Sequence, residues 1–146
     1  MLQDPRTASS VIHLALLVGQ LIFAAVALVI ERSIAPPEGL SADLLLTATS
    51  IATLLSIVAS WVLSRTLLRT AVSLPAETER MAAGLRAFLL RIAILEFSGF
   101  LTLLAYLFTG ENTFLGIFGV NVIALVLGKA SDDEWESVQI GNTSRS

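Results

Sequence analysis

The sequence predicts an all-α membrane protein, a bundle of four transmembrane helices with the N- and C-termini in the cytoplasm. Three observations support this prediction. Of the 146 residues, 55% are hydrophobic and only 14% are charged, whereas soluble domains carry about 25% charged residues. Four apolar segments follow one another, and a helix needs roughly 20 such residues to cross a bilayer. Arginine and lysine gather in the segments that would share one side of the membrane.

The first predicted span covers about residues 9–30, roughly 22 residues that would extend about 33 Å as a helix. Its apolar part is longer than the roughly 7–15 residues typical of a signal peptide, so we interpret it as a retained helix. Glu31 and Arg32 end the span, and the sequence Pro-Pro-Glu-Gly at 36–39 predicts a stiff turn.

The second predicted span covers about residues 43–63. Ser41 is placed as its N-cap, and Asp43 lies in the first turn, where a negative charge is favourable. The helix is expected to leave the membrane at Arg65 and Arg69.

The third predicted helix runs from Pro75 to Phe108, and residues 83–108 form its membrane span. Proline suits a first helical turn, and Gly110 is placed as the C-cap. At about 34 residues the helix exceeds the length needed to cross, so its first turns are expected to project into the cytoplasm.

The fourth predicted span covers residues 112–128, but its apolar core is only about 14 residues, which is short for a full crossing. Residues 1–130 therefore form one membrane domain, and the polar, acidic tail at 131–146 is expected to be flexible. Trp135 in this tail is expected at the membrane surface or in solvent, with docking of a partner as the alternative.

The distribution of positive charge predicts the orientation. With four spans, Arg32 alone lies in an outer loop, and the other side holds Arg6, Arg65, Arg69, Arg80, Arg86, Lys129 and Arg145. This bias predicts that both termini are cytoplasmic. We expect a multi-pass protein of a bacterial cytoplasmic membrane. We also expect Arg65, Arg69, Arg80 and Arg86 to contact anionic lipid headgroups.

Polar residues recur at one depth when the spans are aligned by their midpoints. Glu96 shares this depth with Gln20, Thr53 and Asn121. In apolar surroundings such a carboxyl is expected to be neutral and to donate a hydrogen bond to one of the amides. One interpretation is a structural layer that joins the helices. The alternative is a proton or cation site, with His13 as a possible relay.

Small and polar residues form two stripes that predict close helix packing or an oligomer contact. Gly84, Arg91, Ser98 and Ala105 recur every seven residues on the third helix, on a face distinct from that of Glu96. Arg91 is expected either to reach the cytoplasmic interface or to face a neighbouring helix or a second protomer. The second stripe, on the second helix, comprises Thr49, Thr53, Ser56, Ser60 and Ser64.

The segment Leu-Arg-Ile-Ala-Ile-Leu-Glu-Phe-Ser-Gly-Phe-Leu-Thr-Leu-Leu-Ala-Tyr-Leu-Phe at 90–108 resembles the carboxylate-bearing helix of rotary ATPase proteolipid (c-ring) subunits. The resemblance implies H⁺ or Na⁺ binding at Glu96. It covers about 19 residues, and the family's glycine-rich partner helix has no counterpart, since the first span holds Gly19 alone. The whole chain is similar to small four-helix membrane proteins of bacteria.

The remaining chemistry of the chain argues against several classes of function. It has no cysteine and one histidine, too few ligands for a usual metal site, and it lacks a nucleophile–base constellation or a phosphate-binding glycine loop. We expect no cofactor, no nucleic-acid partner and no enzymatic activity. The expected function is non-catalytic, through helix–helix contacts in the bilayer, as a homo-oligomer or an accessory subunit of a membrane complex. Proton or cation transport through Glu96 is the alternative, and a role in binding or organising lipid is a third.

Overall fold

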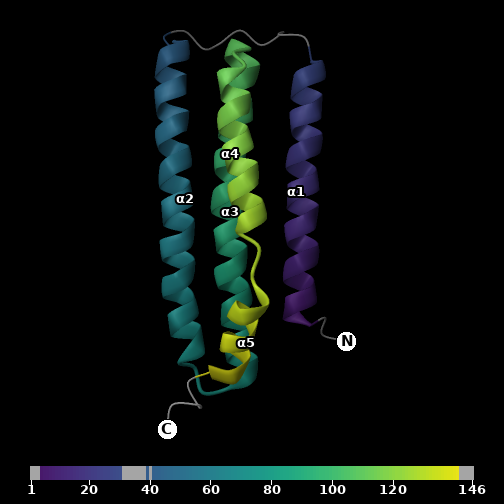
Figure 1. Cartoon of the computed structure of the whole chain (residues 1–146), viewed down its shortest axis with the longest axis vertical. Helices are drawn as coiled ribbons and strands as arrows, with labels where there is room; N and C mark the ends of the chain where they lie inside the picture. Colours follow the sequence, from purple (N-terminus) through teal and green to yellow (C-terminus); the bar gives the residue numbers. More distant parts are fainter. Residues whose placement is uncertain (1–3, 31–38, 40, 142–146) are drawn as a thin grey trace.

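The computed structural model describes residues 4–30, 39 and 41–141. Five helices follow in order, as Figure 1 shows: α1 (Pro5–Val29), α2 (Ala42–Val72), α3 (Glu77–Thr109), α4 (Thr113–Leu127) and α5 (Asp132–Ile140). The described residues are thus all-α, as predicted. Arg32, Arg145 and most of the turn predicted at 36–39 lie outside this part of the chain.

Local signals explain where the helices begin and end. Ser41 caps α2 as predicted, because its Oγ accepts a hydrogen bond from the Leu44 amide at 3.2 Å. Gly110 ends α3 in the left-handed conformation at φ 65°, which glycine adopts without steric cost. The start of α3 differs from the prediction: it begins at Glu77 rather than Pro75. The carbonyls of Leu74 and Pro75 instead accept hydrogen bonds from the Arg80 guanidinium, at 3.1 and 3.0 Å.

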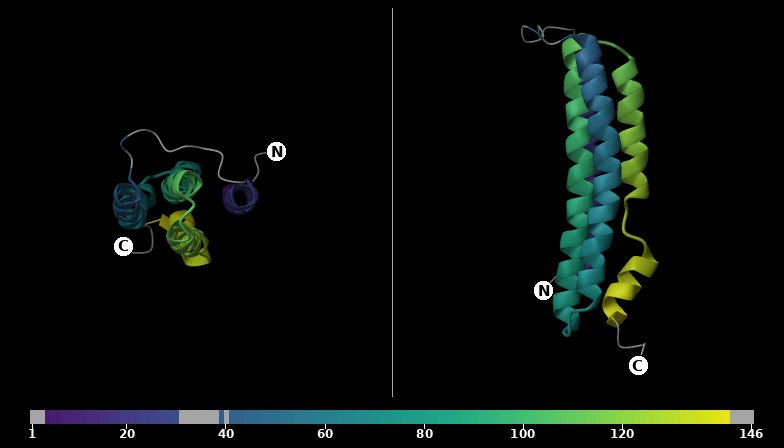
Figure 2. Two further views of the ribbon diagram at one scale, coloured as in Figure 1. Left: turned by 90° about the horizontal axis from the view of Figure 1, so that it is seen from above. Right: turned by 90° about the vertical axis from the view of Figure 1, so that its left-hand side faces the viewer.

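Helix α3 lies at the centre of the bundle and contacts each of the other four helices. Figure 2 shows α1 and α2 on opposite sides of α3, with α4 against a third side. Helices α1 and α3 run in one direction, and α2 and α4 run in the other (Figure 1). The start of α1 and the end of α5 therefore lie at the same end of the bundle.

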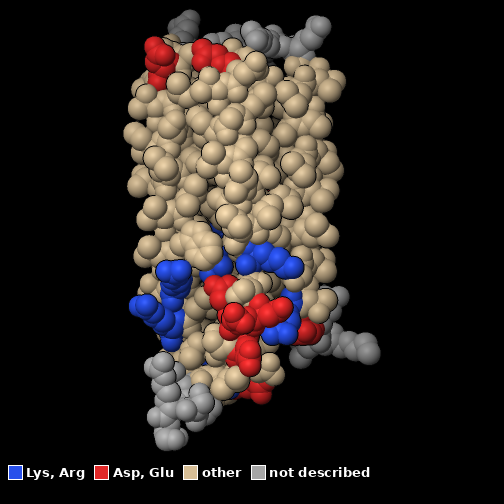
Figure 3. Space-filling view, viewed as in Figure 1, with Lys and Arg blue, Asp and Glu red and all other residues tan. Residues whose placement is uncertain are grey.

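Charge is confined mostly to the two ends. In α2, no charged residue lies between Asp43 and Arg65, a distance of about 33 Å along a helix, close to the thickness of a bilayer core. Figure 3 shows the matching uncharged region on one face of the molecule; we call this level of the bundle the central band. The end that carries α5 holds Arg6, Arg65, Arg69, Arg80, Arg86 and Lys129.

Three helices are long and apolar enough to cross a membrane, namely α1, α2 and α3. The fourth predicted span differs from a single crossing helix. Helix α4 has only 15 residues, about 22 Å, and the chain then bends by 43° into α5. The protein therefore has three candidate spans, or four if α4 and α5 together form a broken one.

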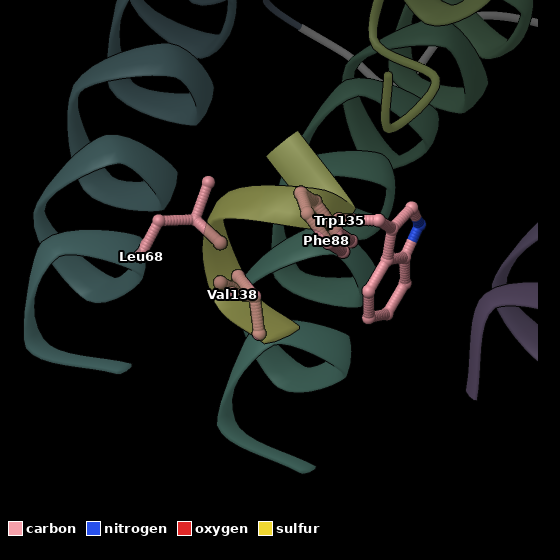
Figure 4. Close-up of a cluster of buried hydrophobic side chains, with 5 residues drawn as sticks. Leu68, Phe88, Trp135 and Val138 are labelled. Carbon is pink, nitrogen blue, oxygen red and sulfur yellow. The ribbon is translucent and has the colours of Figure 1, made fainter. Parts of the chain in front are cut away.

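The tail also differs from its prediction. Residues expected to be flexible form α5, whose N-cap Ser131 and Glu134 make a reciprocal capping box. Trp135 and Val138 are buried, at 2% and 0% exposure. Figure 4 shows both side chains packed with Leu68 of α2 and Phe88 of α3. Burial of these two apolar side chains supplies the free energy that a polar segment otherwise lacks.

Candidate functional site

A buried arginine lies where α2, α3 and α5 meet. Arg91 is fully buried, and its Nη2 donates to Glu134 Oε1 at 2.8 Å while Nη1 reaches Oε2 at 3.3 Å. Nε donates to Ser64 Oγ at 2.9 Å, and Nη1 also reaches the Gly128 carbonyl at 3.4 Å. The bidentate pairing satisfies the charge and fixes the direction of the guanidinium.

Two aromatic rings complete the surroundings of this guanidinium. The Arg91 carbon Cζ lies 4.6 Å from the centre of the Trp61 ring and 5.5 Å from that of Phe88, within cation–π range. Arg91 therefore faces neighbouring helices of the same chain. It does not extend to the surface of the bundle, since its side chain is fully buried.

Glu134 is held in place by its own helix as well as by Arg91. Its Oε2 accepts a hydrogen bond from the Ser131 amide at 3.0 Å. Burial alone would raise the pKa of this carboxyl, but the hydrogen bonds from Arg91 and Ser131, together with the positive charges of Arg91 and Arg65, outweigh it and lower the pKa below its usual value. The carboxylate is therefore ionised at neutral pH, as the pairing requires.

A second arginine anchors the other end of α5. The Arg80 guanidinium donates to the carbonyls of Val138 and Gln139 at 3.1 and 2.9 Å, and to the two carbonyls before α3 described above. Arg80 is only 7% exposed, because it satisfies carbonyls that the helix end and the turn leave free. The prediction that Arg80 contacts lipid headgroups therefore does not fit, whereas Arg65, Arg69 and Arg86 are exposed.

The stripe of small and polar residues on α3 faces the interior of this chain. Gly84, Arg91, Ser98 and Ala105 are all buried. A Cβ added at Gly84 would lie 3.0 Å from a Val138 methyl group, so α5 occupies the space that this glycine leaves. The stripe forms intramolecular contacts and is not available for an oligomer.

The stripe on α2 faces α3 in the same way. Ser60 is buried and Ser56 is partly buried. Ser60 donates to the Ile57 carbonyl of its own helix at 2.8 Å, which satisfies the hydroxyl without a partner on α3. Small side chains here let the two helices approach closely.

Three of the four residues of the predicted polar layer are fully inside the bundle. Asn121 Nδ2 donates to Thr53 Oγ1 at 3.1 Å, and that hydroxyl lies 3.2 Å from Ser98 Oγ. On another side of α3, Gln20 Nε2 donates to the backbone carbonyl of Glu96 at 2.9 Å. A Cβ at Gly99 would meet Gln20 Nε2 at 2.6 Å, so this glycine provides room for the amide.

The Glu96 side chain is the exception. It is partly exposed on the outside of the bundle, and no hydrogen bond or ion pair joins it to another of the residues that the structure describes. The expected donation from this carboxyl to the amide oxygen of Gln20 or Asn121 is absent there, because the carboxyl lies on the outside of the bundle and both amides lie inside it. Within the described residues, Gln20 Oε1 and Asn121 Oδ1 have no hydrogen-bond partner. The Glu96 neighbours Phe97 and Phe100 are 66% and 37% exposed.

His13 does not connect with Glu96. Its side chain is 6% exposed and faces the interior from α1. Within the described ranges its Nδ1 has no hydrogen-bond partner, and no group of three histidine or carboxylate side chains there is arranged to hold a metal ion. The geometry thus gives no relay from His13 to the carboxyl.

Glu134 is the functional residue that sequence reasoning missed, whereas Ser64 was predicted to lie in a packing stripe but not to bond Arg91. The capping box Ser131-Asp-Asp-Glu134 was a local signal for a helix in the tail. The pairing of Glu134 with a residue 43 positions away had no such signal.

Comparison with known proteins returned no matching family model, no matching curated protein and no matching solved structure. The chain is a helical protein with three to four long apolar helices.

Proposed function

We propose that this protein is a non-catalytic integral membrane protein that acts through helix–helix contacts in the bilayer, as a homo-oligomer or an accessory subunit of a membrane complex. The observation that supports it is the unpaired Glu96 carboxyl, partly exposed at the level of the central band. Phe97 and Phe100 extend the same outer face of α3. We call Glu96, Phe97 and Phe100 the outer α3 face.

The cost of leaving this carboxyl to lipid favours association. An ionised side chain at the centre of a membrane helix costs about 2.5–3.5 kcal/mol on insertion scales. A neighbouring helix that hydrogen-bonds the carboxyl removes part of that cost and adds roughly 0.6 kcal/mol per polar contact. The buried polar residues of α3 described above make their contacts within the chain, so the Glu96 carboxyl, flanked by two exposed phenylalanines, is available to a partner helix.

Cysteine cross-linking tests the proposal directly, because the chain contains no cysteine. Phe97→Cys places a thiol on the outer α3 face, and Val58→Cys places a matched thiol on the outside of α2, where Val58 is 60% exposed. We expect oxidation in bilayers to give covalent dimers with Phe97→Cys and few with Val58→Cys. Adding Glu96→Leu should reduce the Phe97→Cys dimer.

Two results would refute the homo-oligomer. One is equal cross-linking at both positions, which would mean random collision. The other is a strictly monomeric protein in bilayers. In that case, the accessory-subunit form predicts that mild detergent recovers a stable complex with another protein, and that Glu96→Leu abolishes this complex.

Proton or cation transport through Glu96 is the second candidate, and the accessible carboxyl supports it. The contacts of Gln20, Asn121 and His13 favour the first candidate, because none of them extends from the carboxyl toward either end of the bundle. Flux of H⁺ or Na⁺ in liposomes that is abolished by Glu96→Gln would favour transport. Flux unaffected by that substitution would end this alternative.

We also propose that the α5 end faces the cytoplasm of a bacterial cell. The arginine and lysine residues at that end support this orientation, because positive residues are retained on the cytoplasmic side. Labelling of cysteines placed at Arg69 and Glu111 by a membrane-impermeant reagent tests it. Only Glu111→Cys should react from outside.

A further inference from the structure

A cleft opens between the first turns of α1 and the segment that joins α4 to α5. Its volume is about 720 Å³, within the range of roughly 300–1,000 Å³ that is usual for ligand pockets. Arg6 and Ser10 line it from α1, and Lys129 and Ser131 line it from the α4–α5 link. Trp135 of α5 also lines it.

The two cations of this cleft, Arg6 and Lys129, come from two separate elements, α1 and the α4–α5 link. Neither the Arg6 nor the Lys129 side chain has an ion pair or hydrogen bond within the part of the chain that the structure describes. The carboxylate of Asp132 also lines the cleft, so two positive charges face one negative charge. This balance favours an anion that carries one charge and several acceptor oxygens, as a phosphodiester does.

The position of the cleft favours a lipid over a soluble anion as the ligand. Arg6 lies in the first turn of α1, whereas Val11 and Leu14 line the same cleft one to two turns closer to the central band. Both are largely exposed, at 61% and 60%. The cleft is thus charged toward the end of the bundle and apolar toward its centre, which matches the polarity of a phospholipid.

We propose that this cleft binds the phosphate of an anionic phospholipid headgroup, with Arg6 and Lys129 as the phosphate ligands and Val11 and Leu14 along the first part of an acyl chain. Basic pockets between membrane helices are known to select anionic lipids. This site is distinct from the outer α3 face and does not depend on oligomer formation.

Native mass spectrometry of the full chain in detergent tests the proposal, with phosphatidylglycerol and phosphatidylcholine as probes. We expect tighter binding of phosphatidylglycerol. The variant Arg6→Gln/Lys129→Gln should weaken that binding about 30-fold, at about fivefold for each charge. Asp132→Asn should strengthen it. Circular dichroism melting checks that the variants keep the fold, as expected because Lys129 and Asp132 are exposed and Arg6 is only partly buried.

The matched control is Arg65→Gln/Arg69→Gln, which removes the same charge from exposed positions at the same end of the bundle. Because Arg65 and Arg69 are themselves expected to contact anionic headgroups, some loss of phosphatidylglycerol binding is expected, about fivefold or less, and clearly smaller than the loss in Arg6→Gln/Lys129→Gln. An equal loss in both double variants would overturn the proposal, because it would show general surface attraction. No preference for phosphatidylglycerol would overturn it as well. Displacement of the lipid by excess inorganic phosphate would assign the site to a soluble phosphate and overturn the lipid assignment.

Discussion

Replacing Glu134 with glutamine removes the negative charge that faces Arg91 and keeps the shape of the side chain. Breaking a fully buried ion pair by removing one partner costs about 3–5 kcal/mol, because it leaves a buried charge uncompensated. The Glu134 side chain is 26% exposed, and Arg91 keeps its contacts with Ser64 and Gly128. We therefore expect a smaller cost of roughly 2–3 kcal/mol for the docking of α5.

Hydrogen–deuterium exchange of the α5 amides measures this cost, because local opening controls their exchange. The expected loss corresponds to exchange about 30 to 150 times faster over residues 132–140. Amides in the middle of α2 should be unaffected. Glu136→Gln is the matched control, since Glu136 lies on the same helix and is exposed.

Acceleration of less than about threefold in Glu134→Gln would refute this reasoning. So would an equal effect of Glu136→Gln, because the loss would then reflect the net charge of α5. The double variant Arg91→Met/Glu134→Leu removes both charges of the pair. It should be more stable than Glu134→Gln alone, because no charge remains buried.

Three further predictions follow from the same contacts. Hydrogen bonds hold the pKa of Glu134 below its usual value despite burial, so the stability it contributes is present above the pKa of the unfolded chain. That stability is lost as the pH falls through the lower pKa of the folded state. Tryptophan fluorescence should therefore show that the docking of α5 depends more steeply on acid pH in wild type than in Glu134→Gln. Arg80→Met removes the hydrogen bonds to four backbone carbonyls and should cost roughly 3 kcal/mol. Faster proteolysis of α5 would show this loss. Gly99→Ala should lower the thermal stability by about 1–3 kcal/mol through its clash with Gln20. Gly19→Ala, with no atom within 4 Å of the new Cβ, should raise it by up to about 1 kcal/mol, and similar effects of the two would contradict the packing described.

The long helices could be predicted because their signals are local. An apolar run of sufficient length, a serine before it and a glycine after it are all read within one segment, and Ser41 and Gly110 act as predicted. The depth of a residue in the membrane could also be predicted, because it needs only the length of each apolar segment. Thr53 and Asn121 were placed at one level in this way, and they do share a hydrogen bond.

Orientation around the helix axis could not be obtained by the same reasoning. Depth gives the level of Glu96 but not the side of α3 that it faces, and its side chain lies on the outside. The Gln20 amide does reach residue 96, but it donates to the backbone carbonyl and not to the side chain.

Helix α5 was missed for a different reason. Its composition is polar and acidic, which is typical of a flexible tail. Its order depends on Arg80 and Arg91, two side chains of α3 that lie far from it in the sequence. A pattern within the tail could indicate a helix but not the partners that hold it.

The distance along the chain between Arg91 and Glu134 has a consequence for biogenesis. Synthesis proceeds from the N-terminus, so α3 must be made and delivered to the membrane before α5 exists. Until α5 leaves the ribosome, the guanidinium has no carboxylate to pair with. Premature termination between the end of α4 at Leu127 and residue 134 would therefore leave the apolar helices complete, with an uncompensated cation between them. Helix α5 thus acts as a late check on assembly, since Glu134 supplies the only charge that neutralises the arginine among the described residues.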